Sequence, residues 1–202
     1  MIHLIGAGGH AKVVLDALLE SGTNLSGVTA RADAPAPDLL GLTVEAPAVA
    51  PSLAGLSFHV AIGAAAIRER LTAEAGSAGG AALTVIHPAA TVSRFALVSD
   101  GSFIAAAAVL GPKAIIGRGV IVNHGAVVDH DCAVGDFTHI APNASLGGGV
   151  TVGARCLVGA GAVVLPGVAI GDDVTIGAGA VVTRDVAAHQ TWTGVPAAPK
   201  AS

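Results

Sequence analysis

The chain has 202 residues, of which 52% are hydrophobic, 12% charged and 2% aromatic, and its formal net charge at pH 7 is −4. Because Lys and Arg form no cluster, it lacks the concentrated positive charge that nucleic acids and anionic membranes require. No apolar run approaches the roughly 20 residues that cross a bilayer, and Gly and His come too early for a signal peptide. We therefore expect a cytoplasmic protein with a closely packed aliphatic core.

Residues 1–85 have the pattern of a small α/β domain. A short apolar strand, a glycine turn and an amphipathic helix ending near Gly22 come first. Further apolar segments predict strands over 25–30, 58–63 and 82–87, with a helix over 67–75. The alternation of strand and helix indicates a Rossmann-like parallel sheet.

The turn after the first strand fits the loose G-x-G-x-x-G/A pattern, with Gly6, Gly8 and Ala11. In this pattern the glycines let a phosphate approach the backbone at a helix N-terminus. Dinucleotide binding is disfavoured, because the second strand closes with Ala30-Arg31 instead of the acid that binds the ribose. The domain is also too short for both mononucleotide halves. The pattern favours another phosphate-bearing ligand, with a purely structural turn as the alternative.

Residues 86–187 form seventeen consecutive hexads without an insertion. The first position is always Ile, Val or Leu, and the fifth is always Ala, Val, Ser, Thr or Cys. A period of six with β-branched residues predicts a solenoid of strands and turns. Three hexads per coil give a triangular prism in which residues eighteen apart stack. Cys132 and Cys156 hold small fifth positions and should face inward without meeting. Residues 188–202 are the C-terminal tail.

Polar side chains gather in the stretch VDHDCAVGDFTH, residues 128–139. His130 and Asp131 take the third and fourth positions of one hexad, and His139 takes the sixth position of the next. None of these positions faces the aliphatic interior, so the three side chains should line the outer wall. A histidine beside a carboxylate is a usual general base. An exposed His-Asp pair is also common on ordinary solvated surfaces, so both interpretations stay open at this point.

The chain resembles the NeuD/PglD-type sugar acetyltransferases, which are hexapeptide-repeat acyltransferases. The resemblance is carried by the repeat together with GAGGHAK (6–12), IHP (86–88), HDCAVGDFTHIAP (130–142) and GVPA (194–197). It implies a left-handed parallel β-helix, although parallel crossovers are otherwise right-handed in about 98% of cases. It also implies a homotrimer with acetyl-CoA at the seam between neighbouring subunits, and an N-terminal domain that holds a sugar nucleotide.

The resemblance also assigns roles to single residues. His130 would remove a proton from the attacking amine or hydroxyl, and Asp131 would raise its basicity. His139 would lie beside the acetyl-CoA thioester, and the backbone N–H of Gly148 would stabilise the oxyanion. The remaining matches are Ala160 and Ala178 for backbone contacts to the coenzyme, and Gly8, Gly9, His10 and Gly63 for the sugar nucleotide. Transfer would be direct, and no metal is expected.

The predicted function is acetyl-CoA-dependent N-acetylation of a nucleotide-linked amino-deoxy sugar in bacterial surface-glycan biosynthesis. O-acetylation of sialic acid or another sugar is the alternative. Family members often end the second strand with an acidic pair and place Asn or Asp after the third, whereas this chain has Ala30-Arg31 and Ala64-Ala65. Both changes remove polar contacts to the nucleotide, so we expect a different nucleotide, weak binding or a free sugar. Asp33 is a candidate for the missing acid.

Two other functions compete with acetyl transfer. Zinc chemistry of the γ-class carbonic anhydrases would use histidines such as His124, His130 and His139. Their separations of six and nine residues differ from the pair five apart in that family, which also lacks an N-terminal α/β domain. His124, one hexad before His130, is a candidate substrate contact on the same wall. A non-catalytic trimeric scaffold is the other possibility.

Overall fold

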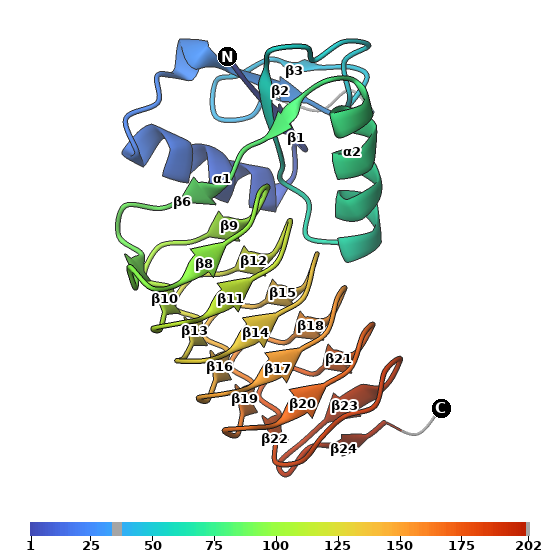
Figure 1. The fold of residues 1–202 in the computed structure, drawn as a ribbon. Helices are drawn as coiled ribbons and strands as arrows, with labels where there is room; N and C mark the ends of the chain where they lie inside the picture. The colour runs from blue at the N-terminus through green and yellow to red at the C-terminus, as the bar shows by residue number, and fades with distance from the viewer. Residues whose placement is uncertain (34–37, 201–202) are drawn as a thin grey trace.

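The computed structural model describes residues 1–33 and 38–200, so residues 34–37 of the N-terminal domain and 201–202 of the tail lie outside the described residues. The N-terminal domain is a five-stranded parallel sheet with strand order β3-β2-β1-β4-β5 (Figure 1). Its strands are β1 Ile2–Ile5, β2 Val28–Arg31, β3 Val44–Glu45, β4 Ser57–Val60 and β5 Ala81–Ala82. Its helices are α1 Gly9–Glu20, the short 3₁₀ helix Leu25–Gly27 and α2 Ala65–Ser77.

The predicted alternation of strand and helix is therefore present, with local differences. The segment predicted as a strand over 25–30 begins with the 3₁₀ turn, because Ser26 and Gly27 interrupt its apolar run. The strand predicted over 58–63 ends at Val60, and residues 61–64 form the loop that leads into α2. The two-residue strand β3 belongs to no repeat, so no sequence pattern predicts it.

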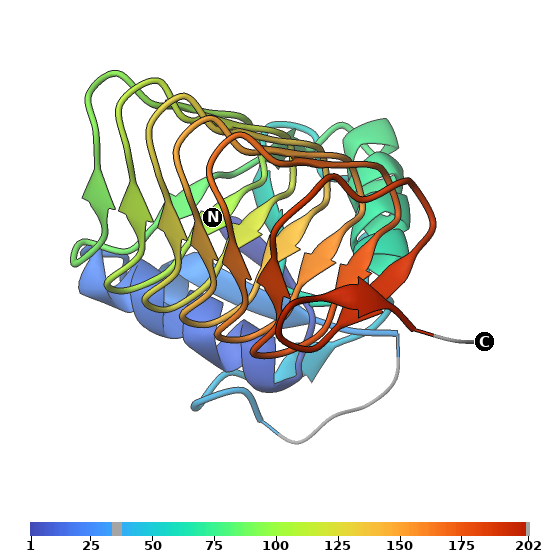
Figure 2. The ribbon, with the colours of Figure 1, turned by 90° about the horizontal axis from the view of Figure 1, so that it is seen from below.

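The second part of the chain winds into a left-handed parallel β-helix of two-residue strands, which bears out the predicted fold (Figures 1 and 2). Three sheets form its faces, and each is named here after its first strand. The β7 sheet contains β7 Thr91–Val92, β10 Val109–Leu110, β13 Val127–Val128, β16 Ser145–Leu146, β19 Val163–Val164 and β22 Val181–Val182. The β8 sheet contains β8 Leu97–Val98, β11 Ile115–Ile116, β14 Ala133–Val134, β17 Thr151–Val152 and β20 Ala169–Ile170.

The β6 sheet contains β6 Val85–Ile86, β9 Phe103–Ile104, β12 Ile121–Val122, β15 His139–Ile140, β18 Leu157–Val158, β21 Thr175–Ile176, β23 Thr191–Thr193 and β24 Ala198–Pro199. Pairing between coils from β6 to β22 joins residues eighteen apart, as the hexad period predicts, for example Val109 with Val127. The antiparallel pair β23 and β24 closes the last coil, and Trp192 packs there on the solenoid core. Among the described residues, no helix has the length and apolarity to cross a membrane.

The interior of the prism is a column of Ile, Val, Leu and Ala. The first hexad position is the second residue of each strand and points inward, as Val128 and Val134 do. Cys132 and Cys156 are free thiols, 0% and 2% exposed, so both lie inside the packed wall as expected. Because the inward positions are filled by small and aliphatic side chains, the outward positions are available for contacts with other parts of the molecule.

The N-terminal domain rests on the outer face of the β6 sheet. Outward residues of successive coils stack there, among them Phe103, Ile121, His139 and Leu157. Phe103 and Ile121 are 0% and 1% exposed, because they share one apolar cluster with α1 and the sheet of the N-terminal domain. His139, one coil further, is half-buried, and Leu157 is exposed. His139 therefore lies at the edge of the contact between the two domains.

Candidate functional site

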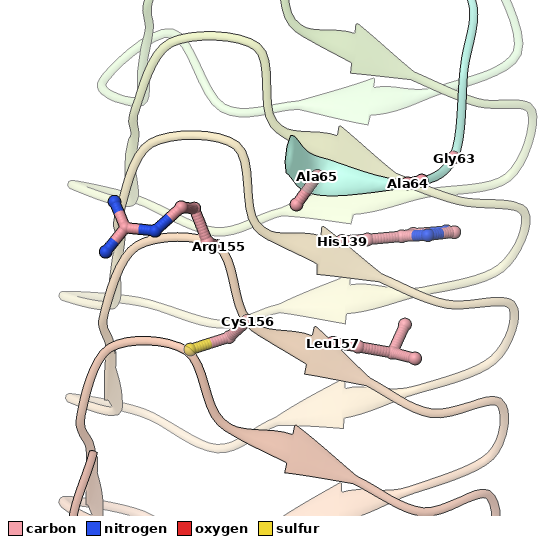
Figure 3. A pocket seen from close by; sticks show the side chains of 7 residues that line it. All are labelled: Gly63, Ala64, Ala65, His139, Arg155, Cys156 and Leu157. Atoms are coloured by element: carbon pink, nitrogen blue, oxygen red, sulfur yellow. The ribbon is translucent and has the colours of Figure 1, made fainter. Parts of the chain in front are cut away.

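A pocket of about 460 Å³ opens at this edge, between the loop that precedes α2 and the outer face of the β6 sheet (Figure 3). It is lined by Gly63, Ala64, Ala65, His139, Arg155, Cys156 and Leu157. His139 and Leu157 project to the same side from neighbouring strands, and the segment with Gly63 and Ala64 lies above His139 in this view. The structure thus brings Gly63 and His139, which are 76 positions apart in the sequence, to one pocket.

The imidazole of His139 is held neutral. Burial lowers its pKa to about 4, and the cationic Arg68 adds to the shift. The side-chain nitrogen of Asn123 lies 3.1 Å from Nε2 of His139 and fixes the ring. A neutral, oriented ring beside a pocket can exchange hydrogen bonds with a bound ligand without adding charge.

His10 lies next to His139, with ring centroids 6.4 Å apart, and stands edge-on to Phe103 at 5.4 Å. Burial lowers its pKa to about 3, with smaller contributions from His59, His139, Arg68 and His124. Its Nε2 atom is buried and has no hydrogen-bond partner among the residues that the structure describes. A buried polar atom without a partner is rare in folded proteins, so His10 has unused hydrogen-bonding capacity at this edge.

The glycines of the turn before α1 divide into two kinds. Gly6 is required by the fold, because its φ is +129° and a Cβ would come within 2.7 Å of the Ala61 carbonyl oxygen. Gly8 and Gly9 are exposed, and a Cβ on either would meet no atom of residues 1–33 or 38–200 within 4 Å. No side chain among the described residues caps α1, so its first N–H groups are available to an anion. The turn is therefore structural at Gly6 and open at Gly8 and Gly9.

A second group of polar residues surrounds His130, which lies in the turn between β13 and β14. Its Nδ1 is 2.9 Å from Oδ2 of Asp131, and its backbone N–H donates to Asp129 at 2.7 Å. The hydrogen bond to Asp131 raises the pKa of His130, and the charge of Asp129 adds to that effect. Since Nδ1 faces the carboxylate, Nε2 is the ring nitrogen left free to take a proton.

The free side of the His130 ring lies over Gly148, the equivalent residue of the next coil. A Cβ on Gly148 would come within 2.4 Å of Nε2 of His130, so only glycine fits beneath the ring as it stands. The N–H of Gly149 donates to the carbonyl of His130, whereas the N–H of Gly148 has no acceptor among the described residues. An unused backbone N–H beside a candidate base can stabilise negative charge on a reacting oxygen.

Asp131 has a left-handed backbone conformation with φ of +56°. Aspartate tolerates this region better than most residues, which would give its presence a purely conformational reason. The equivalent corners, however, contain Lys113, Phe137 and Arg155 with similar φ values. The corner conformation does not demand an acid, and the contact with His130 remains as the distinctive feature of Asp131.

The two groups lie on opposite sides of the prism. His130 is in the corner between the β7 and β8 sheets, and His139 is on the outer face of the β6 sheet. In a triangular prism this corner is opposite that face (Figure 2). Within one chain, His130, Asp131 and Gly148 therefore form one group. His10, Gly63 and His139 form a second group, which is separated from the first by the width of the prism.

The other predicted positions fall on the side of His139. Ala160 and Ala178 are exposed residues in the turns that follow β18 and β21, and Gly179 N donates to Ala160 O at 2.8 Å between these stacked turns. His124 lies in the corner between the β6 and β7 sheets, so its predicted place on the wall of His130 is wrong. One hexad is one face of the prism, so residues six apart occupy different corners. Among the described residues, no group of three or more His, Cys, Asp or Glu could hold a metal ion.

The departures from the family pattern have structural roles at the end of β2. Arg31 is buried, bonds Oε2 of Glu45 at 2.5 Å and donates to the Pro47 carbonyl at 2.9 Å. Asp33, the candidate for the missing acid, accepts from the N–H of Ala48 at 3.2 Å. Ala64 and Ala65 line the pocket, where they leave room that larger polar residues would fill.

Three residues of this region were not singled out from the sequence. Asn123 stands at a second hexad position, where glycine is the commonest residue, and that departure was an available signal. Arg155 lines the pocket and pairs with Asp173 of the next coil at 2.8 Å. Arg68 belongs to a helix with many charged residues, so its sequence context suggests an exposed side chain, yet it is buried.

Family comparisons agree with both parts of the architecture. The PglD N-terminal domain family matches residues 1–75. Residues 131–165 match the bacterial transferase hexapeptide (six repeats), and residues 149–184 match the hexapeptide repeat of succinyl-transferase. A search of curated protein sequences finds no match.

Solved structures extend the similarity over the whole chain. A variant of perosamine N-acetyltransferase from Caulobacter crescentus, in complex with CoA and GDP-perosamine, is 38% identical with a TM-score of 0.91, over 100% of this chain and 97% of that chain. The acetyltransferase domain of PglB from Neisseria gonorrhoeae FA1090, in complex with acetyl coenzyme A, is 35% identical with a TM-score of 0.92, over 98% of each chain. WeeI from Acinetobacter baumannii AYE is 26% identical with a TM-score of 0.89, over 99% of each chain.

Proposed function

Since the chain belongs to the PglD-type family of hexapeptide-repeat sugar acetyltransferases, we propose that it transfers the acetyl group of acetyl-CoA to the amino group of a nucleotide-linked amino-deoxy sugar. The product would enter bacterial surface-glycan biosynthesis. The complex of the Caulobacter relative with CoA and GDP-perosamine supports this choice of substrates. The observation that carries the proposal is the His130 ring, which Asp131 orients over Gly148, whose backbone N–H has no acceptor among the described residues.

His130 is the general base of the proposed reaction. Its Nε2 removes a proton from the amine as the nitrogen attacks the thioester carbonyl carbon, and the carboxylate of Asp131 stabilises the imidazolium that forms. Exposure of the ring to solvent is compatible with this role, because the substrates themselves would cover it. General-base assistance of this kind contributes on the order of 10²- to 10⁴-fold to a rate.

The Gly148 N–H is the oxyanion donor. Negative charge develops on the thioester oxygen in the tetrahedral intermediate, and a preorganised N–H aimed at that oxygen is worth about 10²- to 10³-fold in kcat. Collapse of the intermediate breaks the carbon–sulfur bond and releases CoA, and the proton held by His130 passes to the leaving thiolate. The acetylated amine and CoA are the products, and the base returns to its neutral form.

Transfer is direct in this scheme, without an acyl-enzyme. Cys132 is buried, donates its thiol to the Gly147 carbonyl at 3.2 Å, and has a pKa raised by burial. Cys156 lines the pocket, but burial likewise raises the pKa of its thiol, which donates to Gly171 O at 3.0 Å. Neither thiol is disposed to form the thiolate that an acyl carrier would need.

The site is shared between two copies of the chain. Because His130 and His139 lie on opposite sides of one prism, a coenzyme that contacts His139 reaches His130 only from a neighbouring protomer. Exposed apolar side chains on the β8 sheet, Leu97 and Ile115, offer area for such a contact. A closed ring of three protomers satisfies every such interface. In this trimer Ala160 and Ala178 contact the coenzyme on the side of His139.

The sugar nucleotide occupies the N-terminal domain in this proposal. The open turn at Gly8 and Gly9, with the uncapped start of α1, receives the phosphates. His10 and the Gly63 loop border the sugar at the edge of the pocket, where the unpartnered Nε2 of His10 can bond a polar group of the ligand.

The proposal is tested by mass spectrometry of acetyl transfer from labelled acetyl-CoA to UDP-, dTDP- and GDP-linked amino sugars and to free sialic acids. We expect transfer to one nucleotide-linked amino sugar and its loss in His130→Ala. Acetylation of a sialic acid hydroxyl alone would replace the proposed acceptor. Absence of both transfer and acetyl-CoA binding would contradict the proposal as a whole.

A further inference from the structure

Arg68 connects the two domains through an unusual set of hydrogen bonds. It lies in the first turn of α2 and is 1% exposed. Its Nε donates to the Gly119 carbonyl at 2.7 Å and its Nη2 to the Phe137 carbonyl, both in the β-helix. Its Nη1 donates to the carbonyls of Ile62 and Gly63, at 2.9 and 2.8 Å, in the loop before α2. One guanidinium thus holds four carbonyls from two domains.

Three of these four carbonyls belong to segments that reach the pocket: those of Ile62 and Gly63 in the loop before α2, and that of Phe137 just before His139. Gly119 and Phe137 are eighteen residues apart and occupy stacked turns at the corner between the β8 and β6 sheets. Phe137 is two residues before His139, and Gly63 faces His139 across the pocket. The guanidinium therefore sets the distance between the Gly63 loop and the strand that contains His139.

We propose that Arg68 is a positioning residue for acetyl transfer, which holds the Gly63 loop and the Phe137–His139 segment in the relative placement that the two substrates require. This inference rests on the proposed function, in which Gly63 borders the sugar and His139 borders the thioester. A misplacement of about 1 Å between reacting groups can lower a rate about 10²-fold. A fixed link between the two binding surfaces therefore helps to maintain the rate of acetyl transfer.

The chemistry of the link is specific to arginine. No carboxylate among the described residues forms an ion pair with Arg68, and burial lowers its pKa only to about 10, so the side chain stays charged at neutral pH. Burying a charge without a counterion is unfavourable unless its donors are satisfied. The planar fork satisfies four donors at once, whereas a lysine ammonium has only three donors around one point.

Domain docking does not depend on Arg68 alone. The N-terminal domain also packs on Phe103 and Ile121 through an apolar cluster that includes Ala11, Val14 and Leu15 of α1. This packing should keep the domains together when the guanidinium is removed. Loss of Arg68 should therefore loosen the loop at residues 62–64 more than it separates the domains, which distinguishes positioning from general stabilisation.

The chain offers a matched control at the same two turns. Arg118 and Asp136, the residues just before Gly119 and Phe137, form an exposed ion pair at 2.8 Å. Arg118→Gln removes a bond between these stacked turns without touching the N-terminal domain. Two variants of the full-length chain remove the guanidinium of Arg68. Arg68→Lys retains the positive charge, and Arg68→Met does not.

The experiment measures kcat and KM for the acceptor, the Kd for acetyl-CoA, the thermal midpoint, and hydrogen exchange of the amides at 62–64. We expect Arg68→Lys to lower kcat/KM for the acceptor by about 10-fold or more, to leave the Kd for acetyl-CoA within about 3-fold, and to speed exchange at 62–64. Arg118→Gln should leave all of these unchanged. A lower midpoint with unchanged kcat/KM and exchange would overturn the proposal.

The link can still be tested if the Arg68 variants misfold or if the proposed function is wrong. If the Arg68 variants do not fold, Gly119→Ala tests the link instead, because its Cβ would meet the Phe137 ring at 2.6 Å while Arg68 stays in place. We expect the same loss in kcat/KM and the same faster exchange, and their absence would count against the proposal. If the wild-type protein acetylates no amino sugar, the proposed function fails, whereas exchange at 62–64 still shows whether Arg68 holds the loop.

Discussion

Gly148→Ala separates the geometry of the candidate base from the stability of the fold. The added Cβ would lie 2.4 Å from Nε2 of His130, whereas ordinary contact begins at about 3.4 Å, so the ring must move by about 1 Å. The backbone of Gly148 does not have a positive φ, so alanine is accommodated there without backbone strain. We expect the exposed His130 side chain to move away from the new methyl group and to lose its hydrogen bond to Asp131.

The expected result is a large kinetic effect with a small effect on folding. A displacement of about 1 Å corresponds to about a 10²-fold fall in kcat, or roughly 2.7 kcal/mol in the activation free energy. The thermal midpoint should change little, because a side chain at the surface takes up the clash. Steady-state kinetics and thermal unfolding of the same preparation give both quantities.

A double-mutant cycle identifies the cause. If Gly148→Ala acts only by displacing His130, it should add almost no further loss to His130→Ala, because the two changes remove the same function. The alanine retains a backbone N–H at position 148, so the oxyanion donor is kept in both backgrounds. Wild-type kcat in Gly148→Ala, or a full additional loss in the double variant, would refute the assignment of His130 as the displaced base.

Two pH effects follow from the shifted histidines. His130 acts in its neutral form, so kcat/KM should rise with pH through the raised pKa of His130. Asp131→Asn should move the midpoint of this pH profile to lower pH and should lower the kcat/KM reached at high pH. An unmoved midpoint would contradict the role of Asp131. His10, His59 and His139 have folded-state pKa values of about 3, 4 and 4, below the 6.5 of an ordinary histidine, so the unfolded chain binds more protons between pH 6.5 and 4. The thermal midpoint should therefore fall as the pH is lowered through that window, and a flat profile there would show that these rings are not held neutral.

The repeat allowed much of the β-helix to be predicted residue by residue. Because pairing joins residues eighteen apart, the hexad frame places Val128 and Cys132 inside and His130 outside, as the structure has them. The spacing of eighteen residues per coil also places the two histidines. His130 and His139 are nine residues apart, which is half a coil, so they lie on opposite sides of the prism. The error for His124 has the same origin, since six residues are one face and not one coil.

The rest of the site depends on how the N-terminal domain docks, which no local pattern encodes. The sequence does not reveal that Phe103 and Ile121 are covered while His139 is left at the edge, because all three hold the same hexad position. The sequence of α2 likewise suggests an exposed Arg68. The side chain is buried because it donates to carbonyls in two turns of the β-helix that are distant in the sequence. Contacts between segments far apart in the chain decide both features.

The most direct test of the account is complementation between two variants, His130→Ala and His139→Ala, each expected to be nearly inactive alone. Co-expression in equal amounts should restore about one quarter of wild-type acetyl transfer, because random assembly joins the two intact halves at about one interface in four. The mixture is assayed with the acceptor and labelled acetyl-CoA, beside each parent variant. Activity no greater than that of the parents, in oligomers shown to contain both variants, would contradict a site shared between His130 of one chain and His139 of another.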